Sequence, residues 1–212
     1  MKTISTLLLL TISFACKAQT PILPRYDNPD FGDIEGAYYK DTFNDYDHFE
    51  GSWQYTNGNS LFKVLLQKKE MVYVEASLGG SSYYVDMLIG EYQYVENGVE
   101  KVNTLPNMNI TYNNPRKHNI SGGIITKYNA NVPSICIGCQ PGEVMVDLIL
   151  QEPNVEIPGA YIRIYFRYFI ENGIEKLETN AHLSGRPSYP IGETVNNNYS
   201  IPLDTTFILV KQ

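Results

Sequence analysis

Two nearly identical stretches of sequence, each centred on an Asn-Gly pair, limit the folds open to this chain. Residues Tyr94–Thr104 read YVENGVEKVNT, and residues Phe169–Thr179 read FIENGIEKLET. Each copy places β-branched or aromatic residues on both sides of Asn-Gly. A type I′ turn needs positive φ at both central residues, and Asn-Gly tolerates this well. The sequence therefore predicts two β-hairpins.

Most of the remaining chain also alternates with a period of two residues, which is typical of strands. Val144, Val146, Leu148 and Leu150 share one face, as do Ile162, Ile164 and Phe166. We predict strands over residues 49–55, 60–67, 71–74, 83–95, 99–104, 118–128, 143–151, 160–170, 174–181 and 205–211, a turn at Asn57-Gly58, and bends or bulges at Gly90 and Gly122-Gly123. The fold class is therefore all-β: a single antiparallel barrel or sandwich of about nine or ten strands.

The first 18 residues have the features of an export signal. Lys2 supplies a positive charge, and Leu7–Ala15 is apolar but too short to span a bilayer. Two processing sites fit the residues that follow. In one, Cys16 is lipidated and becomes the mature N-terminus. In the other, Cys16 and Ala18 form an A-x-A-like site with cleavage before Gln19. The lipidated form is favoured, and we expect contact with a membrane only through that lipid.

Residues 19–48 are predicted to form an ordered polar lead-in to an antiparallel β domain over residues 49–212. The lead-in is rich in Pro, Asp, Asn and Tyr and shows no strand alternation. Its acids suggest a calcium loop, and Asp45 and Asp47 have the required alternate spacing. The sixth position of such a loop is Gly, however, and here it is Glu50. A solvated acidic turn is therefore the favoured interpretation, and no metal site is predicted.

Neither the composition nor the motifs of the chain predict a reaction. The sequence has 23 acidic against 16 basic residues, whereas a nucleic-acid surface needs a basic face. No G-x-S-x-G nucleophile motif is present, and the Gly-rich stretch at 79–82 lacks the strand-to-helix context of a phosphate-binding loop. We therefore predict no catalytic residues and no cofactor.

One strand face carries the candidate ligand-binding residues. In the strand predicted over 160–170, Arg163 and Arg167 alternate with Tyr161 and Tyr165. A wall of this kind inside a barrel would bind an anionic or sugar-like ligand. The other interpretation, which cross-strand packing favours, is an outer sheet face on which solvated Arg side chains cover Tyr rings. The expected partner is a small apolar or sugar-like ligand.

The pair Cys136-x-x-Cys139 has four possible roles. A redox site of the thioredoxin type needs a helix that starts at the motif, and here Pro141-Gly142 and a strand follow. A zinc site needs two more ligands with similar spacing. Residues i and i+3 of a turn lie close enough for a disulfide, which an exported chain would keep. A disulfide is the favoured role, with redox activity, metal binding and free thiols left open.

Gly51-Ser52-Trp53, at the start of the first long strand, resembles the G-x-W signature of lipocalin-like barrels. The resemblance implies structural roles for two of these residues: Trp53 plugs the closed end, and Gly51 lets the chain pass beneath. Such barrels also place an Arg from near the last strand on the Trp. This sequence departs from that pattern, because its last strand offers only Lys211.

A second resemblance covers nearly the whole chain. It rests on the leader Cys16–Thr20, the Tyr39–Thr42 turn, Glu50–Trp53, the Asp86–Tyr94 strand and the ending Ile208–Gln212. These segments are similar to a family of small bacterial envelope proteins of unknown function, which has no assigned catalytic residues. The resemblance implies an outer-membrane lipoprotein or a periplasmic or secreted protein. We expect a non-catalytic binding or structural domain, with an envelope hydrolase or glycan-active enzyme as the alternative.

Overall fold

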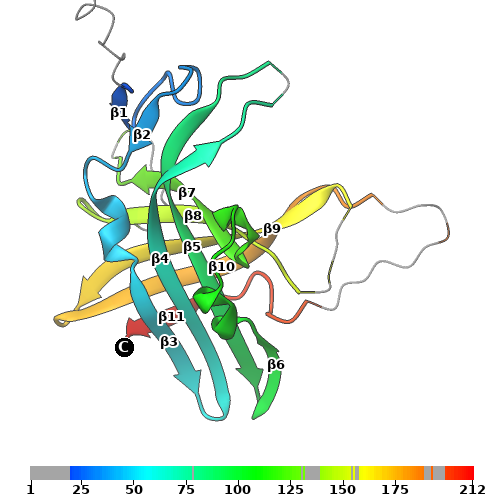
Figure 1. Ribbon diagram of the computed structural model, residues 1–212. Helices are drawn as coiled ribbons and strands as arrows, with labels where there is room; N and C mark the ends of the chain where they lie inside the picture. Colours follow the sequence, from blue (N-terminus) through cyan, green and yellow to red (C-terminus); the bar gives the residue numbers. More distant parts are fainter. Residues whose placement is uncertain are drawn as a thin grey trace, which may run out of the picture.

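The computed structural model describes residues 20–77, 79–129, 131, 139–153, 155, 158–188, 192 and 199–212. Within these residues the chain forms eleven strands and three short 3-10 helices (Figure 1). The strands are β1 (Ile22–Pro24), β2 (Tyr38–Lys40), β3 (Gly51–Asn57), β4 (Ser60–Val74), β5 (Tyr83–Glu96), β6 (Val99–Asn103), β7 (Ile120–Lys127), β8 (Val144–Leu150), β9 (Ala160–Glu171), β10 (Ile174–Gly185) and β11 (Phe207–Lys211). The 3-10 helices are η1 (Asp45–His48), η2 (Leu105–Asn109) and η3 (Pro115–Lys117).

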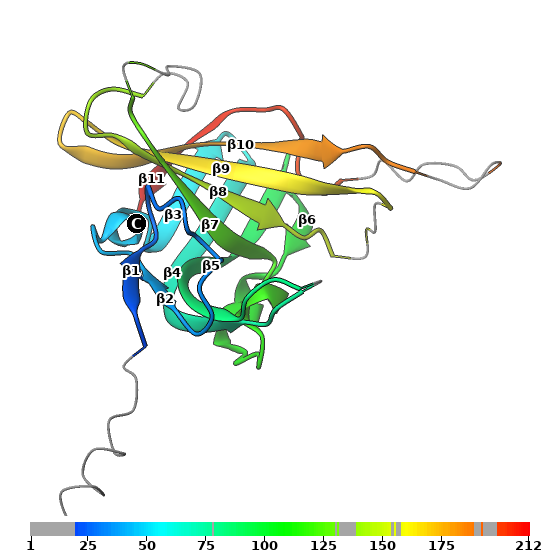
Figure 2. The same ribbon diagram turned by 90° about the horizontal axis from the view of Figure 1, so that it is seen from above.

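Eight strands form a closed antiparallel barrel in the order β5-β4-β3-β11-β10-β9-β8-β7, and β7 pairs back onto β5. In Figure 1, β8, β9 and β10 cross the direction of β3, β4 and β5, and Figure 2 shows the same strands from above. The all-β prediction is confirmed, and of its two forms the barrel is correct. The described residues contain eleven strands rather than nine or ten, partly because three-residue strands such as β1 and β2 are too short to show alternation.

The barrel closes through a short seam. β5 and β7 pair only at Leu88↔Gly122, Ile89↔Ser121 and Gly90↔Ile120. β5 runs on through Gly90, where a bend was predicted. A Cβ at Gly90 would lie 2.7 Å from the carbonyl oxygen of Leu65 on β4. Glycine at this position therefore serves the close approach of two neighbouring strands rather than a break in the strand.

Both Asn-Gly hairpins are confirmed. Asn97 and Gly98 have φ of 52° and 80°, and Asn172 and Gly173 have φ of 53° and 77°, as a type I′ turn requires. Their settings differ, however. β9 and β10 pair along their full length within the barrel, whereas β6 lies off the barrel and pairs only with β5.

Two local predictions were wrong by one or a few residues. The first turn lies at Gly58-Asn59 instead of Asn57-Gly58, since Asn57 pairs with Ser60. A type II′ turn prefers Gly at its first central position, and Gly58 occupies that position here. The segments 60–67 and 71–74 are one strand, β4, because a bulge between Lys69 and Val72 absorbs the irregularity.

Large apolar side chains fill the interior of the barrel. The predicted inward faces of β8 and β9 are confirmed, and the interior includes Trp53, Phe62, Tyr92, Phe166, Leu177 and Leu209, each at most 1% exposed. Full burial of such a side chain stabilises the fold by about 1.5–3 kcal/mol. One end is covered by the segment before β11, where Ile201 is 2% exposed. Glu152 accepts hydrogen bonds there from the backbone N–H groups of Ser200 and Ile201.

The lead-in packs against the barrel through buried carboxylates. β1 pairs with β2 and β2 with β5, both in parallel. Asp86 of β5 is fully buried and accepts hydrogen bonds from the Tyr38 hydroxyl (2.5 Å) and from the backbone N–H of Asp41 (2.9 Å). Burial, followed by the hydrogen bond to Asp86, raises the pKa of Tyr38. The hydrogen bonds of this carboxylate thus hold the lead-in against the start of β5.

The prediction of a solvated acidic turn after β2 is correct only in part, because Asp47 is exposed and two other acids of the turn are buried. Asp41 and Asp45 are 1% and 5% exposed. Asp41 accepts hydrogen bonds from the backbone N–H groups of Asp45 and Tyr46. Lys68 forms ion pairs with Asp41 and Asp47, and Lys127 with Asp45. These ion pairs hold the turn and η1 against β4 and β7.

Candidate ligand-binding site

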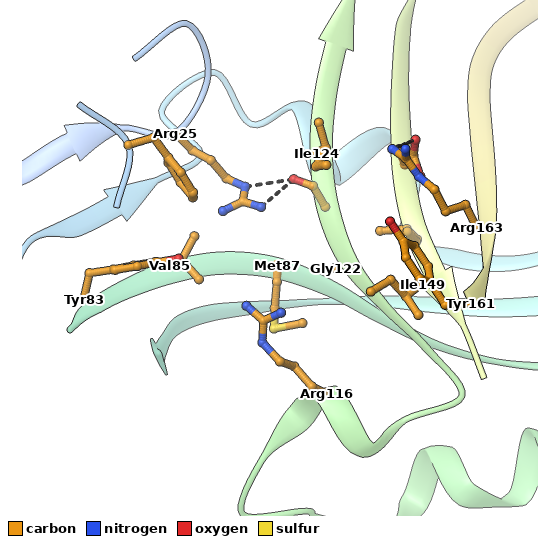
Figure 3. A pocket seen from close by; sticks show the side chains of 14 residues that line it. Arg25, Tyr83, Val85, Met87, Arg116, Gly122, Ile124, Ile149, Tyr161 and Arg163 are labelled. Carbon is orange, nitrogen blue, oxygen red and sulfur yellow. Dashed lines mark hydrogen bonds and ion pairs between the residues drawn. The ribbon is translucent and has the colours of Figure 1, made fainter. Parts of the chain in front are cut away.

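A pocket of about 300 Å³ lies outside the barrel, at the point where β5 and β7 separate. The pairing of these strands ends at Leu88 and Gly122, and the lead-in spans the gap beyond (Figure 3). Aromatic walls come from Phe31, Tyr83 and Tyr161, and aliphatic walls from Val85, Met87, Ile124 and Ile149. The charged side chains that line the pocket are Arg25, Arg116, Asp147 and Arg163.

The bulge in β7 creates the polar centre of this region. The register with β8 shifts between Gly122 and Ile124, so the predicted bulge at Gly122-Gly123 is confirmed. The carbonyl oxygen of Gly123 accepts hydrogen bonds from Nε and Nη2 of Arg25, at 3.0 Å and 2.5 Å. The hydroxyl of Tyr46 donates to the same oxygen at 2.5 Å. Side chains from the lead-in and η1 therefore satisfy a carbonyl at the irregular point of the sheet.

Only glycine fits at position 123. Its φ is 144°, and a Cβ there would overlap the Tyr46 hydroxyl and lie 2.9 Å from Tyr46 Cζ. Burial raises the pKa of Tyr46, and this effect outweighs the nearby Arg25 guanidinium, which lowers it. The phenol therefore stays protonated and donates its hydrogen bond. The positions of Arg25, Tyr46 and Gly123 depend on one another.

Arg25 has one donor group left over. Its Nε and Nη2 bind Gly123, and Nε also contacts the Tyr46 hydroxyl. Its Nη1 is buried and has no hydrogen-bond partner. A buried donor without a partner lowers the stability of the fold by about 1–3 kcal/mol, and by more when it belongs to a charged group. The guanidinium lies 5.2 Å from the ring centre of Phe31, another residue of the pocket wall.

The pocket carries a net positive charge. The guanidinium of Arg163 forms a two-pronged ion pair with Asp147, in which Nε lies 3.0 Å from Oδ1 and Nη2 contacts Oδ2. Arg116 lies in η3 and is exposed, and its guanidinium pairs with no carboxylate among the described residues. Three guanidinium groups thus face one carboxylate.

The four residues predicted to bind a ligand separate into two pairs. Tyr161 and Arg163 line the pocket, whereas Tyr165 and Arg167 lie farther along β9 and do not. Arg167 pairs with Glu143 and Glu178 at 2.8 Å and 2.6 Å. The interpretation of an inner wall is wrong, because Ile162, Ile164 and Phe166 occupy the inner positions and the Tyr/Arg face points outward.

The predicted structural pair, Gly51 and Trp53, does not line the pocket. Trp53 is fully buried and donates from Nε1 to the carbonyl oxygen of Phe49 at 2.8 Å. Nζ of Lys211 lies 5.3 Å from the centre of the Trp53 ring, and a Cβ at Gly51 would touch Lys211. Lys211 therefore supplies a cation over the indole ring.

Lys211 also joins a cluster of polar groups. Its Nζ lies 2.9 Å from Glu175, which accepts a hydrogen bond from the Tyr168 hydroxyl at 2.8 Å. The Lys211 and Tyr168 hydrogen bonds lower the pKa of Glu175. Burial and the bond to Glu175 raise the pKa of Tyr168 to about 12.

The cysteine predictions fall mainly outside the described residues. Cys16 and Cys136 lie outside them, and Cys139 is buried. The lipidation of Cys16 and the Cys136–Cys139 disulfide therefore stay predictions. Within the described chain, no group of three or more His, Cys, Asp or Glu side chains has the arrangement of a metal site. In the same residues, no helix is long and apolar enough to cross a membrane.

One buried acid–base pair was missed by the sequence analysis. Nδ1 of His118 lies 2.8 Å from Oε1 of Glu91, and the two residues are 3% and 0% exposed. The pair is covered by the segment that contains η2 and η3, and Tyr112 packs edge-on against the imidazole. Neither residue lines the pocket described above. The sequence gives no signal for the pair, because its members come from separate segments.

Arg25 and Arg116 were not among the predicted site residues. Neither residue lies in a strand, so no strand periodicity indicates where their side chains point. Arg25 contacts Gly123, which is 98 residues away. A contact of this kind leaves no pattern in a single sequence.

Fold and pocket together define a closed, eight-stranded antiparallel barrel protein with a cationic, aromatic-walled pocket on its outer surface. The chain belongs to the Family of unknown function (DUF6705), whose family model matches residues 1–212. A comparison with curated proteins and one with solved structures gave no significant match. The resemblance to a family of unknown function is thereby confirmed at the level of the family.

Proposed function

We propose that this protein is an exported, non-catalytic protein of the cell envelope that binds a small molecule in the pocket between β5 and β7. The observation that carries the proposal is a cavity of about 300 Å³ with exposed apolar walls. Ile124, Ile149 and Tyr161 are 61%, 39% and 46% exposed. Pockets for small molecules start at about this volume and combine apolar walls with a few polar groups.

The packing of the barrel supports this location. Lipocalin-like barrels hold a ligand in the interior, and Gly51, Trp53 and Lys211 resemble the closed end of such a barrel. Here Phe62, Tyr92 and other large side chains occupy the interior. We therefore place the ligand on the outer surface. Support for export comes from the leader over residues 1–18 and the candidate lipid site at Cys16.

The location is tested by filling the pocket. Ile124→Trp adds volume at the mouth of the pocket, and Ile170→Trp is a matched control because Ile170 is 62% exposed and lies at the far end of β9. We expect the neutral fluorophore N-phenyl-1-naphthylamine to bind the folded protein at one site. Ile124→Trp should weaken that binding at least tenfold, and Ile170→Trp should leave it within twofold.

Equal binding to both variants would place the fluorophore elsewhere and contradict the proposed site. The non-catalytic assignment is tested separately, by assaying the purified protein on glycan, ester and peptide substrates. If the protein turns over one of these substrates and Ile124→Trp abolishes that activity, the pocket is an active site instead.

A further inference from the structure

We propose that the ligand is a small organic anion, with a carboxylate, phosphate or sulfonate group attached to an apolar body, and that Arg25 and Arg116 bind its anionic group. The inference rests on the proposed function, because it specifies what the same pocket binds. It depends on charge and hydrogen bonding, whereas the proposed function depends on the apolar cavity.

The first argument is the charge of the pocket within an acidic protein. The whole chain has a formal charge of −7, yet the pocket has three guanidinium groups and one carboxylate. Asp147 neutralises only Arg163. A pocket of one sign attracts ligands of the other, and apolar walls of low dielectric strengthen this attraction.

The second argument is the arrangement of the two remaining guanidinium groups. Figure 3 shows Arg25 and Arg116 extending toward one another from opposite sides, with Met87 between them at the pocket wall. Two like charges that face the same space repel each other, and an anion bound between them replaces this repulsion with attraction. Arginine suits this role, because its planar fork matches the oxygens of carboxylate, phosphate and sulfonate groups.

The third argument is the orphan donor of Arg25. Gly123 and Tyr46 hold the side chain through Nε and Nη2, and Nη1 is left buried without an acceptor. The side chain is therefore oriented before a ligand arrives. The fixed guanidinium would therefore attract an anion in the pocket through its charge, at little further loss of side-chain entropy.

The walls indicate that the anion has an apolar body. Phe31, Tyr83 and Tyr161 surround the space with rings, and Ile149 adds an aliphatic surface. An inorganic anion would leave these side chains in contact with water. A body with a ring or a short alkyl chain buries them and adds about 25 cal/mol for each Å² removed from water.

The test uses two fluorophores with the same ring system. 8-Anilinonaphthalene-1-sulfonate carries a negative charge, and N-phenyl-1-naphthylamine is its neutral counterpart. We expect the anion to bind at least tenfold more tightly at low ionic strength. Arg116→Gln should reduce that binding about tenfold and leave the neutral fluorophore within twofold. Arg116→Lys should restore part of the loss, and added salt should weaken only the anion.

Lys117→Gln is the matched control, because Lys117 is the neighbouring exposed cation in η3 and does not line the pocket. It should change anion binding by less than twofold. An equal loss in Arg116→Gln and Lys117→Gln would mean a long-range charge effect and would overturn the inference. Arg25→Lys, checked for native thermal unfolding, should also weaken anion binding selectively, because the single nitrogen of lysine cannot replace the planar guanidinium fork that Gly123 and Tyr46 hold in place.

Competition tests the apolar body. Octyl phosphate should displace the anionic fluorophore at a concentration at least tenfold below that of inorganic phosphate, and equal displacement would overturn the inference. Equal binding of the two fluorophores, with no effect of Arg116→Gln, would refute the anion and leave the proposed function intact. Failure of both fluorophores to bind would refute the proposed function itself.

Discussion

Gly123 is the residue on which the pocket most directly depends. Its carbonyl oxygen collects three hydrogen bonds from Arg25 and Tyr46, and its missing side chain leaves room for the Tyr46 ring. We expect Gly123→Ala to lower the free energy of unfolding by about 3 kcal/mol or more, since backbone strain and overpacking each contribute about 1–3 kcal/mol. Urea denaturation measures the loss.

Gly36→Ala separates these two effects. Gly36 has a φ of 71°, and no atom lies within 4 Å of the point that a Cβ would occupy, so alanine there meets strain without overlap. Its loss should be about 1–2 kcal/mol. If both variants lose the same amount, the close approach of Tyr46 has no energetic role.

From the lowered pKa of Glu175 we predict that the stability of the fold depends on pH. Its hydrogen bonds to Lys211 and Tyr168 lower its pKa in the folded protein. Such a carboxylate stabilises the fold above its unfolded pKa of about 4.3, and the effect is lost as the pH falls through the lower folded pKa. Glu175→Gln should therefore unfold more easily at pH 7, by at most about 1 kcal/mol for so exposed a pair.

The difference between Glu175→Gln and the natural protein should shrink below about pH 4.3 and vanish in stronger acid. Chemical denaturation at a series of pH values between 7 and 3 measures it. Lys211→Gln should show the same trend, because it removes the first partner of Glu175. A deficit that stays constant down to pH 3 would show that the ion pair is not its cause.

At the level of elements, the two Asn-Gly hairpins have the same turn and different roles. Gly98 and Gly173 have nearly equal φ, so alanine should strain both turns by about 1–2 kcal/mol. The β9–β10 hairpin is part of the closed barrel, whereas β6 is an edge strand. Gly173→Ala should therefore destabilise the whole barrel, and Gly98→Ala should mainly loosen β6.

Hydrogen exchange distinguishes these outcomes. Amides in residues 99–103 should exchange faster in Gly98→Ala, at a free energy below that of global unfolding. In Gly173→Ala, amides of the barrel strands should exchange faster together. Identical exchange patterns in the two variants would mean that β6 unfolds only with the barrel.

For the whole molecule, the prediction concerns a lipid anchor. Cys16 precedes Arg25 by nine residues in the sequence, so a lipid on Cys16 would hold the pocket near a membrane surface. We expect Cys16→Ser to move the protein from the membrane fraction to the soluble fraction on cell fractionation. Cys139→Ser should leave the distribution unchanged. Unchanged fractionation of Cys16→Ser would favour cleavage before Gln19.

Local chemistry in the sequence was enough to predict the all-β class, the two type I′ hairpins, the bulge at Gly122-Gly123 and the inward faces of β8 and β9. These features depend on neighbouring residues, through turn conformation and two-residue alternation. Barrel closure, the outward direction of Tyr161 and Arg163, and the pocket that contains Arg25 and Arg116 were settled by tertiary contacts. The contact between Arg25 and Gly123 joins residues 98 positions apart. No periodicity encodes such a contact, because it forms only when the barrel closes and the lead-in packs across the gap between β5 and β7.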